Sequence, residues 1–126
     1  MNGIALKDNL GPVLLWHGEF GSGDDWVLTS TKTQGAIPSR LFDSGFDVWI
    51  AWKRGTYPAK GHNTPSTHNA TYNSANGTPA KNFWNFTSEE VATQDLPEII
   101  KFIHKTRSSN SYVCDKLQIV THSAGA

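Results

Sequence analysis

Three short segments rich in apolar residues are spaced along the chain. Residues 13–16, 46–52 and 116–120 read VLLW, FDVWIAW and KLQIV. Apolar runs of this length are typical of strands that are buried on both faces, as in a parallel sheet. The pattern therefore predicts three strands.

A first helix is predicted between the first two strands, at residues 38–44. A proline opens this segment, Leu41 and Phe42 are apolar, and Gly45 follows as a stop signal. Proline in the first turn and glycine just after the last turn are common at helix ends.

A second helix is predicted before the third strand. It starts with the sequence Thr87-Ser-Glu-Glu90, which matches a capping box. Apolar residues then follow at helical spacing, namely Leu96, Ile99, Ile100 and Ile103. Because Pro97 lies inside this stretch, we expect a kink or a new helix start near Asp95. Residues 107–111 are expected to form the turn that leads to the third strand.

The order strand, helix, strand, helix, strand predicts an α/β fold with a mostly parallel sheet and crossover helices. We expect one incomplete domain over residues 1–126, because two helices are few to cover both faces of such a sheet. Residues 53–83 are rich in Asn, Thr, Ser, Pro and Gly. This polar loop is too long for a plain connection, so it is either a functional excursion or a segment that needs further structure to order it.

Composition excludes several classes of function. Eleven basic residues balance eleven acidic ones, so no basic surface for nucleic acid is predicted. The single cysteine, Cys114, excludes an intrachain disulfide framework and a multi-thiolate metal site. His62 and His68 lack a carboxylate or cysteine at ligand spacing, so no metal is predicted.

The sequence as given has neither an apolar run of membrane-spanning length nor a secretory signal segment. It nevertheless carries three acceptor triplets for N-glycosylation, at Asn69, Asn76 and Asn85. Use of these triplets would require a lumenal or secreted protein. The two observations agree if Met1 is not the native start of the full protein.

Candidate catalytic chemistry follows the third strand, in the sequence Thr121-His-Ser-Ala-Gly125. Its spacing matches the nucleophile elbow G-x-S-x-G, with Thr121 in place of the first glycine. Ser123 is therefore the candidate nucleophile. The alternative is a turn at a strand end that carries a surface serine.

A second candidate element, His-Gly-Glu-Phe-Gly, follows the first strand. In α/β-hydrolases the backbone N–H of the residue after the nucleophile and one from a loop after an earlier strand form the oxyanion hole. Here the candidate donors are the N–H groups of Ala124 and Glu19. Taken alone, His17-Gly18 is equally consistent with a loop glycine beside a histidine whose hydrogen bonds are satisfied. Two such motifs, each after a predicted buried strand, favour a hydrolase.

Five segments together resemble the acid lipase family, which includes gastric and lysosomal acid lipases. In chain order these are LLWHGEFGSGDDWV, GFDVWIAWKRG, FWNFTSEE, DLPEIIKFI and THSAG, within residues 11–126. The resemblance implies a partial α/β-hydrolase fold, truncated at the nucleophile elbow. It also implies hydrolysis of ester bonds in neutral lipids such as triacylglycerols or cholesteryl esters. No cofactor or metal is expected, and the implied location is secreted, lysosomal or otherwise lumenal.

The resemblance assigns Ser123 as nucleophile and Glu19 and Ala124 as oxyanion-hole positions. The sequence departs from the family pattern, which usually has Leu at Glu19, Gln at Ala124, Gly at Thr121 and Asn near Trp52. Glu19 matters most, because a carboxylate near a forming oxyanion would oppose it unless the side chain points to solvent.

In this fold the triad acid and histidine follow the serine in the sequence, and only Ala-Gly-Ala follows Ser123 here. His122 is adjacent to the serine and projects in a different direction, so it is not expected to act as the base. We therefore expect the isolated chain to be inactive. Three explanations are open: a partial sequence of a longer lipase, one chain of a split protein completed by a second chain, or a non-catalytic structural or interaction subunit of a larger assembly.

The five tryptophans suggest a further class, a carbohydrate-binding module. Three of them lie in or beside predicted strands, which favours a role in the core. Saccharide binding that is lost on changing Trp26 or Trp84 would support the module instead.

Overall fold

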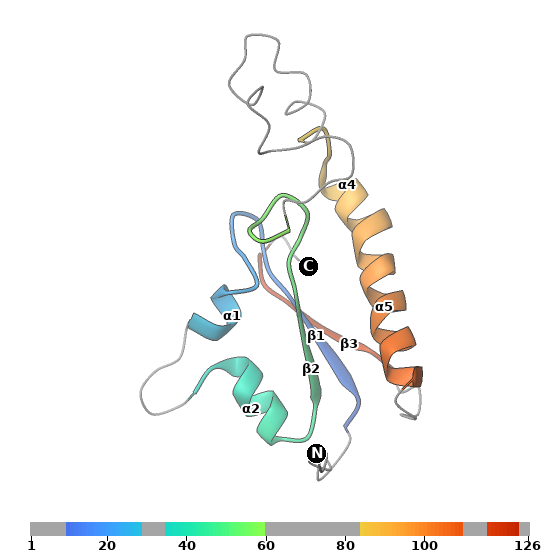
Figure 1. Ribbon diagram of the computed structural model, residues 1–126. Helices are drawn as coiled ribbons and strands as arrows, with labels where there is room; N and C mark the ends of the chain where they lie inside the picture. The colour runs from blue at the N-terminus through green and yellow to red at the C-terminus, as the bar shows by residue number, and fades with distance from the viewer. Residues whose placement is uncertain (1–9, 29–34, 60–83, 110–115, 124–126) are drawn as a thin grey trace.

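The computed structural model describes residues 10–28, 35–59, 84–109 and 116–123. Strands and helices alternate along these segments, and the helices lie on both sides of a small sheet (Figure 1). In chain order the elements are β1 (Pro12–Trp16), α1 (Asp25–Leu28), α2 (Ile37–Asp43), β2 (Asp47–Ala51), α4 (Ser88–Glu90), the π-helical turn η2 (Val91–Asp95), α5 (Leu96–Ser109) and β3 (Gln118–Thr121).

The three strands form a parallel sheet in the order β2-β1-β3. Leu14 of β1 pairs with Trp49 of β2 on one side and with Ile119 of β3 on the other. β1 is buried along its whole length, whereas β3 is exposed. Burial from both faces and both edges explains why β1 is a continuous apolar run. The predicted parallel α/β fold is confirmed.

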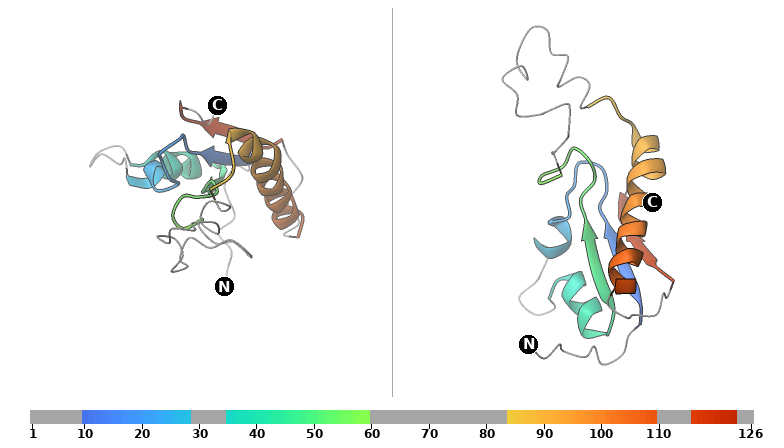
Figure 2. Two further views of the ribbon diagram at one scale, coloured as in Figure 1. Left: turned by 90° about the horizontal axis from the view of Figure 1, so that it is seen from above. Right: turned by 45° about the vertical axis from the view of Figure 1, so that its right-hand side comes forward.

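Successive side chains of β1 point to opposite faces of the sheet. Val13 and Leu15 pack with Trp26 of α1 on one face, and Leu14 and Trp16 pack with Ile103 of α5 on the other. Figure 2 shows α1 and α2 on one side of the sheet and α5 on the opposite side. The strand order explains this division. Strands β2 and β3 lie on opposite sides of β1, so the two crossover connections run in opposite directions across the sheet. Because both connections are right-handed, they lie on opposite faces.

The helical segment before β3 begins with the predicted capping box. Thr87 accepts a hydrogen bond from the N–H of Glu89, and the Glu90 carboxylate accepts one from the N–H of Thr87 at 2.8 Å. The π-helical turn ends at Asp95, and Pro97 lies in the first turn of α5. Because proline cannot donate to the preceding turn, the change from π- to α-helix beside it agrees with the predicted new start near Asp95.

One helix was not predicted, and two expectations about elements were wrong. Residues 25–28 form helix α1, which no pattern in the sequence predicted. Arg107 lies in α5 and not in a turn, because its buried guanidinium pairs with Asp47 at the start of β2 and extends the helix to Ser109. Trp52, placed in the second strand by the apolar run, lies just after β2, which ends at Ala51.

Several sequence predictions fall outside the residues that the structure describes. These are the polar loop over residues 60–83, Cys114, His62, His68, Asn69, Asn76 and Ala124. No helix in the described segments is long and apolar enough to span a membrane.

Candidate active site

The loop after β1 and the residues after β3 meet at the carboxyl edge of the sheet. Trp16 is paired with Thr121, so the next residues of the two strands continue side by side. A Cβ atom on Gly18 would lie 2.8 Å from the carbonyl oxygen of His122 and 2.9 Å from Cβ of Ser123. Only glycine permits this approach. Ligands of open α/β sheets bind at this edge, outside the carboxyl ends of the strands.

Ser123 has a backbone conformation that is uncommon for a residue with a side chain. Its φ is +56°, in the left-handed region, and it is exposed. Such a conformation costs about 1–2 kcal/mol in a non-glycine residue. A nucleophile elbow requires a strained turn soon after a strand, and the left-handed Ser123 lies two residues after β3 ends at Thr121.

His17 is a buried structural residue that joins the ends of β1 and β2. Its Nε2 accepts a hydrogen bond of 3.0 Å from the backbone N–H of Lys53, and its Nδ1 lies 2.8 Å from the carbonyl oxygen of Gly18. These two contacts fit the neutral tautomer with its proton on Nδ1. Burial, assisted by the Lys53 charge, lowers the pKa of His17. The histidine therefore positions the loop and is not poised as a base for Ser123.

Glu19 follows Gly18 on the exposed side of this loop. Its carboxylate acts on the Lys53 ammonium through space and raises the lysine pKa, although burial has the larger and opposite effect. The exposed position and the nearby cation both reduce the opposition that a carboxylate would offer to a forming oxyanion. Ala124, the other predicted donor position, lies outside the described residues.

Lys53 is a feature of this region that sequence reasoning missed. It follows β2, it is only 9% exposed, and its Nζ lies 5.2 Å from the centroid of the Trp16 ring. Burial is the main cause that lowers its pKa. The signal available in the sequence was a Trp-Lys-Arg-Gly tetrapeptide directly after a strand, at the edge where parallel sheets bind ligands.

A cavity of about 370 Å³ lies beside the Ser123 loop on the α1 side of the sheet. It is lined by His17, Asp25, Trp26, Ile37, Val120, Thr121 and His122. Its lining combines apolar surface with a few polar groups, as in sites that bind small organic molecules.

Two other predictions can be placed. Asn85 of the third acceptor triplet is exposed, and the triplet's Thr87 is the N-cap of α4. Within the described segments, no three His, Cys, Asp or Glu side chains are grouped so that they could hold a metal ion.

The chain is similar to several lipases over nearly its whole length. It is 36% identical to triacylglycerol lipase 1 of Arabidopsis thaliana over 114 residues, which are 90% of this chain and 24% of that protein. It is 35% identical to a probable lipase of Schizosaccharomyces pombe over 123 residues, 98% of this chain and 23% of that protein. The gastric triacylglycerol lipase of Bos taurus is 33% identical over 113 residues, 90% of this chain and 24% of the lipase.

No family model matches the chain, and no solved structure matches it. The chain spans about a quarter of the length of the curated relatives. These lipases imply that its α/β fold is a part of an α/β-hydrolase. Together the matches support an acid lipase-like family, to a part of which this chain corresponds.

Proposed function

We propose that this chain contributes the nucleophile and the oxyanion hole of a serine ester hydrolase that acts on neutral lipids. Ser123 is the nucleophile, and the backbone N–H groups of Glu19 and Ala124 are the oxyanion donors. The observation that carries the proposal is the left-handed backbone of Ser123 against Gly18 at the carboxyl edge of the sheet.

The reaction proceeds by acyl transfer. The Ser123 Oγ attacks the ester carbonyl carbon and loses its proton to a general base, while the two N–H groups stabilise the negative charge on the carbonyl oxygen. The bond to the alcohol then breaks and the alcohol leaves with a proton. Water next attacks the acyl-serine and releases a carboxylic acid.

The residues assigned above include neither the general base nor its acid partner. His17 is buried and bonded to the main chain, and His122 neighbours the serine in sequence. In α/β-hydrolases both partners follow the nucleophile. We therefore expect the 126 residues alone to be inactive, and hydrolysis to need further residues or a second chain.

The substrate class rests on the relatives and on the cavity. The plant and bovine relatives are named triacylglycerol lipases, and the cavity of about 370 Å³ beside Val120 offers apolar surface. By the same resemblance we propose a secreted or lumenal protein, in which Asn85 is an accessible candidate for glycosylation.

The test is covalent labelling of the protein isolated from its source. A fluorophosphonate reacts with activated serines, and mass spectrometry of the intact protein and its peptides locates the adduct. We expect a single adduct on Ser123. Ser123→Ala should lose both the label and hydrolysis of a triacylglycerol emulsion, and Ser108→Ala, which changes an exposed serine near the end of α5, should keep both.

Two results would contradict the proposal. Hydrolysis that persists in Ser123→Ala would assign the reaction to another nucleophile. An intact mass near 13.9 kDa without labelling, in preparations that keep bound partners, would instead favour a non-catalytic subunit derived from a hydrolase.

A further inference from the structure

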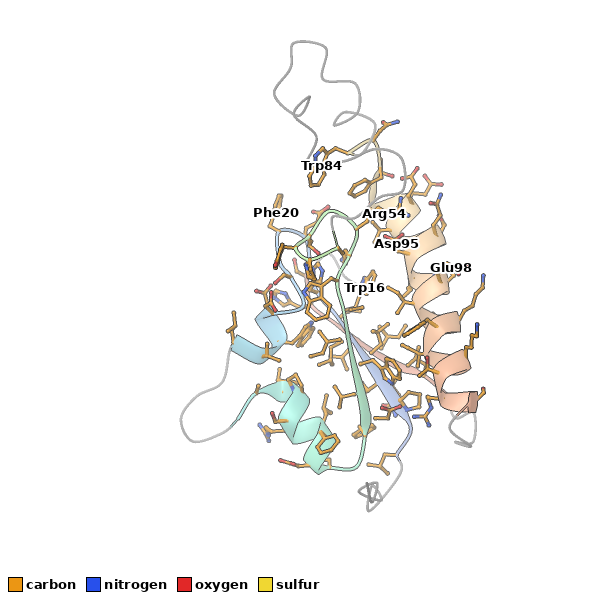
Figure 3. The ribbon with its side chains drawn as sticks, in the orientation of Figure 1. Trp16, Phe20, Arg54, Trp84, Asp95 and Glu98 are labelled. Atoms are coloured by element: carbon orange, nitrogen blue, oxygen red, sulfur yellow. The ribbon has the colours of Figure 1, made fainter. Side chains whose placement is uncertain are left out.

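A second hollow, of about 750 Å³, opens on the other side of the β1 loop from the cavity described above. We refer to it as the Lys53 groove. Its walls come from the ends of β1 and β2, from residues 84–89 and from the start of the helical segment that continues as α5. Figure 3 shows Phe20, Arg54 and Trp84 around this end of the molecule, with Trp16 deeper. Its volume lies in the range of small-molecule sites.

The floor of the groove holds a lysine whose side chain is largely buried. Lys53 is 9% exposed, its Nζ lies over the face of Trp16, and both residues line the groove. Among the described residues, none accepts a hydrogen bond from this ammonium and none forms an ion pair with it. Because most of the lysine side chain is buried while its ammonium keeps contact with solvent, an anionic group entering the groove would supply a charged partner for it.

The other cation in the groove is already paired. The Nε of Arg54 donates to both oxygens of the Asp95 carboxylate, at 2.9 and 2.8 Å, and NH2 donates to Gln94. This pairing raises the pKa of Arg54. The carboxyl residues on the lining are Glu19 and Glu89, both exposed. Within the described segments, the groove therefore presents one cation that has no ion-pair partner, and the lining carboxylates belong to exposed residues.

Apolar groups form the rest of the wall. Trp84 and Phe86 stack with ring centroids 6.2 Å apart, and Val91 and Leu96 continue the lining toward α5. The Trp84 ring lies against Gly55, where a Cβ atom would come within 2.6 Å of it. Gly55 has a φ of +83°, so it serves both the turn and the close approach of the ring. An aliphatic chain would exclude water from these surfaces.

We propose that the Lys53 groove binds a long-chain carboxylate, with its anionic end on the Lys53 ammonium and its chain along the Trp84–Phe86 wall. The choice of a fatty acid rests on the proposed function, because ester hydrolysis of neutral lipids releases this class of product. The groove shares His17 with the cavity on the α1 side of the sheet and is lined by Gly18 and Glu19, so the product would bind beside the proposed oxyanion loop.

Equilibrium binding tests the proposal without turnover. A fluorescent long-chain fatty acid is bound to the purified chain and displaced with dodecanoate below its micellar concentration. Dodecanoate should displace the probe, whereas methyl dodecanoate, with the same chain and no charge, should bind about tenfold or more weakly. Lys53→Met should remove this difference, and Lys53→Arg should retain much of it. Lys101→Met, at an exposed lysine of α5, should match the unchanged protein.

Further variants distinguish binding in the Lys53 groove from the proposed catalytic function. Ser123→Ala should bind dodecanoate normally, so binding does not depend on whether Ser123 is a nucleophile. Glu19→Gln should bind more tightly, because it removes a negative charge that acts on Lys53. If Lys53→Met does not fold, the comparison of acid and methyl ester on the unchanged protein still decides.

Four outcomes would overturn the proposal. These are no displacement by dodecanoate, equal affinity for the acid and its methyl ester, equal weakening in Lys53→Met and Lys101→Met, or tighter binding of dodecyl phosphate than of dodecanoate.

Discussion

Gly18 lies where the loop after β1 most closely approaches the residues after β3. The neighbours that its Cβ atom would meet are the backbone oxygen of His122 and Cβ of Ser123. Neither can move aside by a side-chain rotation. The residue thus couples the proposed oxyanion loop to the proposed nucleophile.

Gly18→Ala should lower the free energy of unfolding by about 1–3 kcal/mol, because the added methyl group must displace backbone. Urea unfolding measures the change. The control is Gly35→Ala, where φ is +63° and no atom of the described segments lies within 4 Å of an added Cβ atom, so only a conformational cost of about 1 kcal/mol is expected. A smaller loss in Gly18→Ala than in the control would contradict the close approach.

His17 should make stability depend on pH. Its folded pKa lies below the ordinary value of 6.5, chiefly because it is buried. The unfolded chain therefore takes up this proton at a higher pH than the folded chain does. The contribution of His17 is fully present above pH 6.5 and is lost as the pH falls through 6.5 toward the lower folded pKa.

His17→Gln should reduce this loss of stability between pH 7.5 and 5.5. Urea unfolding of both proteins at several pH values in this window measures it, and the other histidines contribute equally to both. An unchanged slope would mean that the imidazole of His17 is not held neutral.

At the scale of elements, the segment from α4 to α5 depends on its first turn. Thr87 and Glu90 form the capping box, and hydrogen bonds from the Thr87 hydroxyl and then from its backbone N–H lower the pKa of Glu90. Arg54 ties the middle of the segment to the loop after β2 through Asp95. Together these contacts hold one wall of the Lys53 groove.

Thr87→Ala should cost about 1 kcal/mol of stability through loss of the N-cap. Thr87→Ser should restore most of it, since serine also caps helices well. A matched control is Thr93→Ala, because the Thr93 hydroxyl only donates back to the carbonyl of Glu89 within the helical segment. Urea unfolding of unglycosylated protein separates these variants, and equal costs at Thr87 and Thr93 would argue against the cap.

At the scale of the whole molecule, one ion pair joins the end of α5 to the start of β2. The Arg107 side chain is 4% exposed and that of Asp47 is 29% exposed, and Asp47 also accepts a hydrogen bond from the indole N–H of Trp49 at 2.9 Å. This contact links residues sixty positions apart. It fixes α5 on its face of the sheet.

Asp47→Asn should destabilise the fold by about 3 kcal/mol, because it removes a carboxylate that is paired with a buried guanidinium. Glu98→Gln is the matched control, since it removes an exposed pair with Lys101 that is worth about 0–1 kcal/mol. Urea and thermal unfolding measure both variants. Similar losses in the two would mean that the Arg107 pair is not buried in solution.

The sequence alone determined the elements whose formation depends on residues close together in the chain. Continuous apolar runs mark β1 and β2, because both faces of each strand are covered. The capping box and Pro97 mark where the later helical segment begins and changes. The Ser123 and Glu19 motifs were recognisable because their chemistry depends on the order of small residues after a strand.

Tertiary structure decided what depends on residues far apart in the chain. Helix α1 has only four residues, too few for a periodic pattern, and forms where Trp26 packs on Val13 and Leu15. From the sequence, Arg107 was assigned to a polar turn, because its partner Asp47 lies sixty positions earlier in the chain. Likewise, Lys53 is recognised as a candidate binding residue only from its position over the Trp16 ring in the folded structure. A local pattern carries no information about a partner that folding brings from another strand or helix.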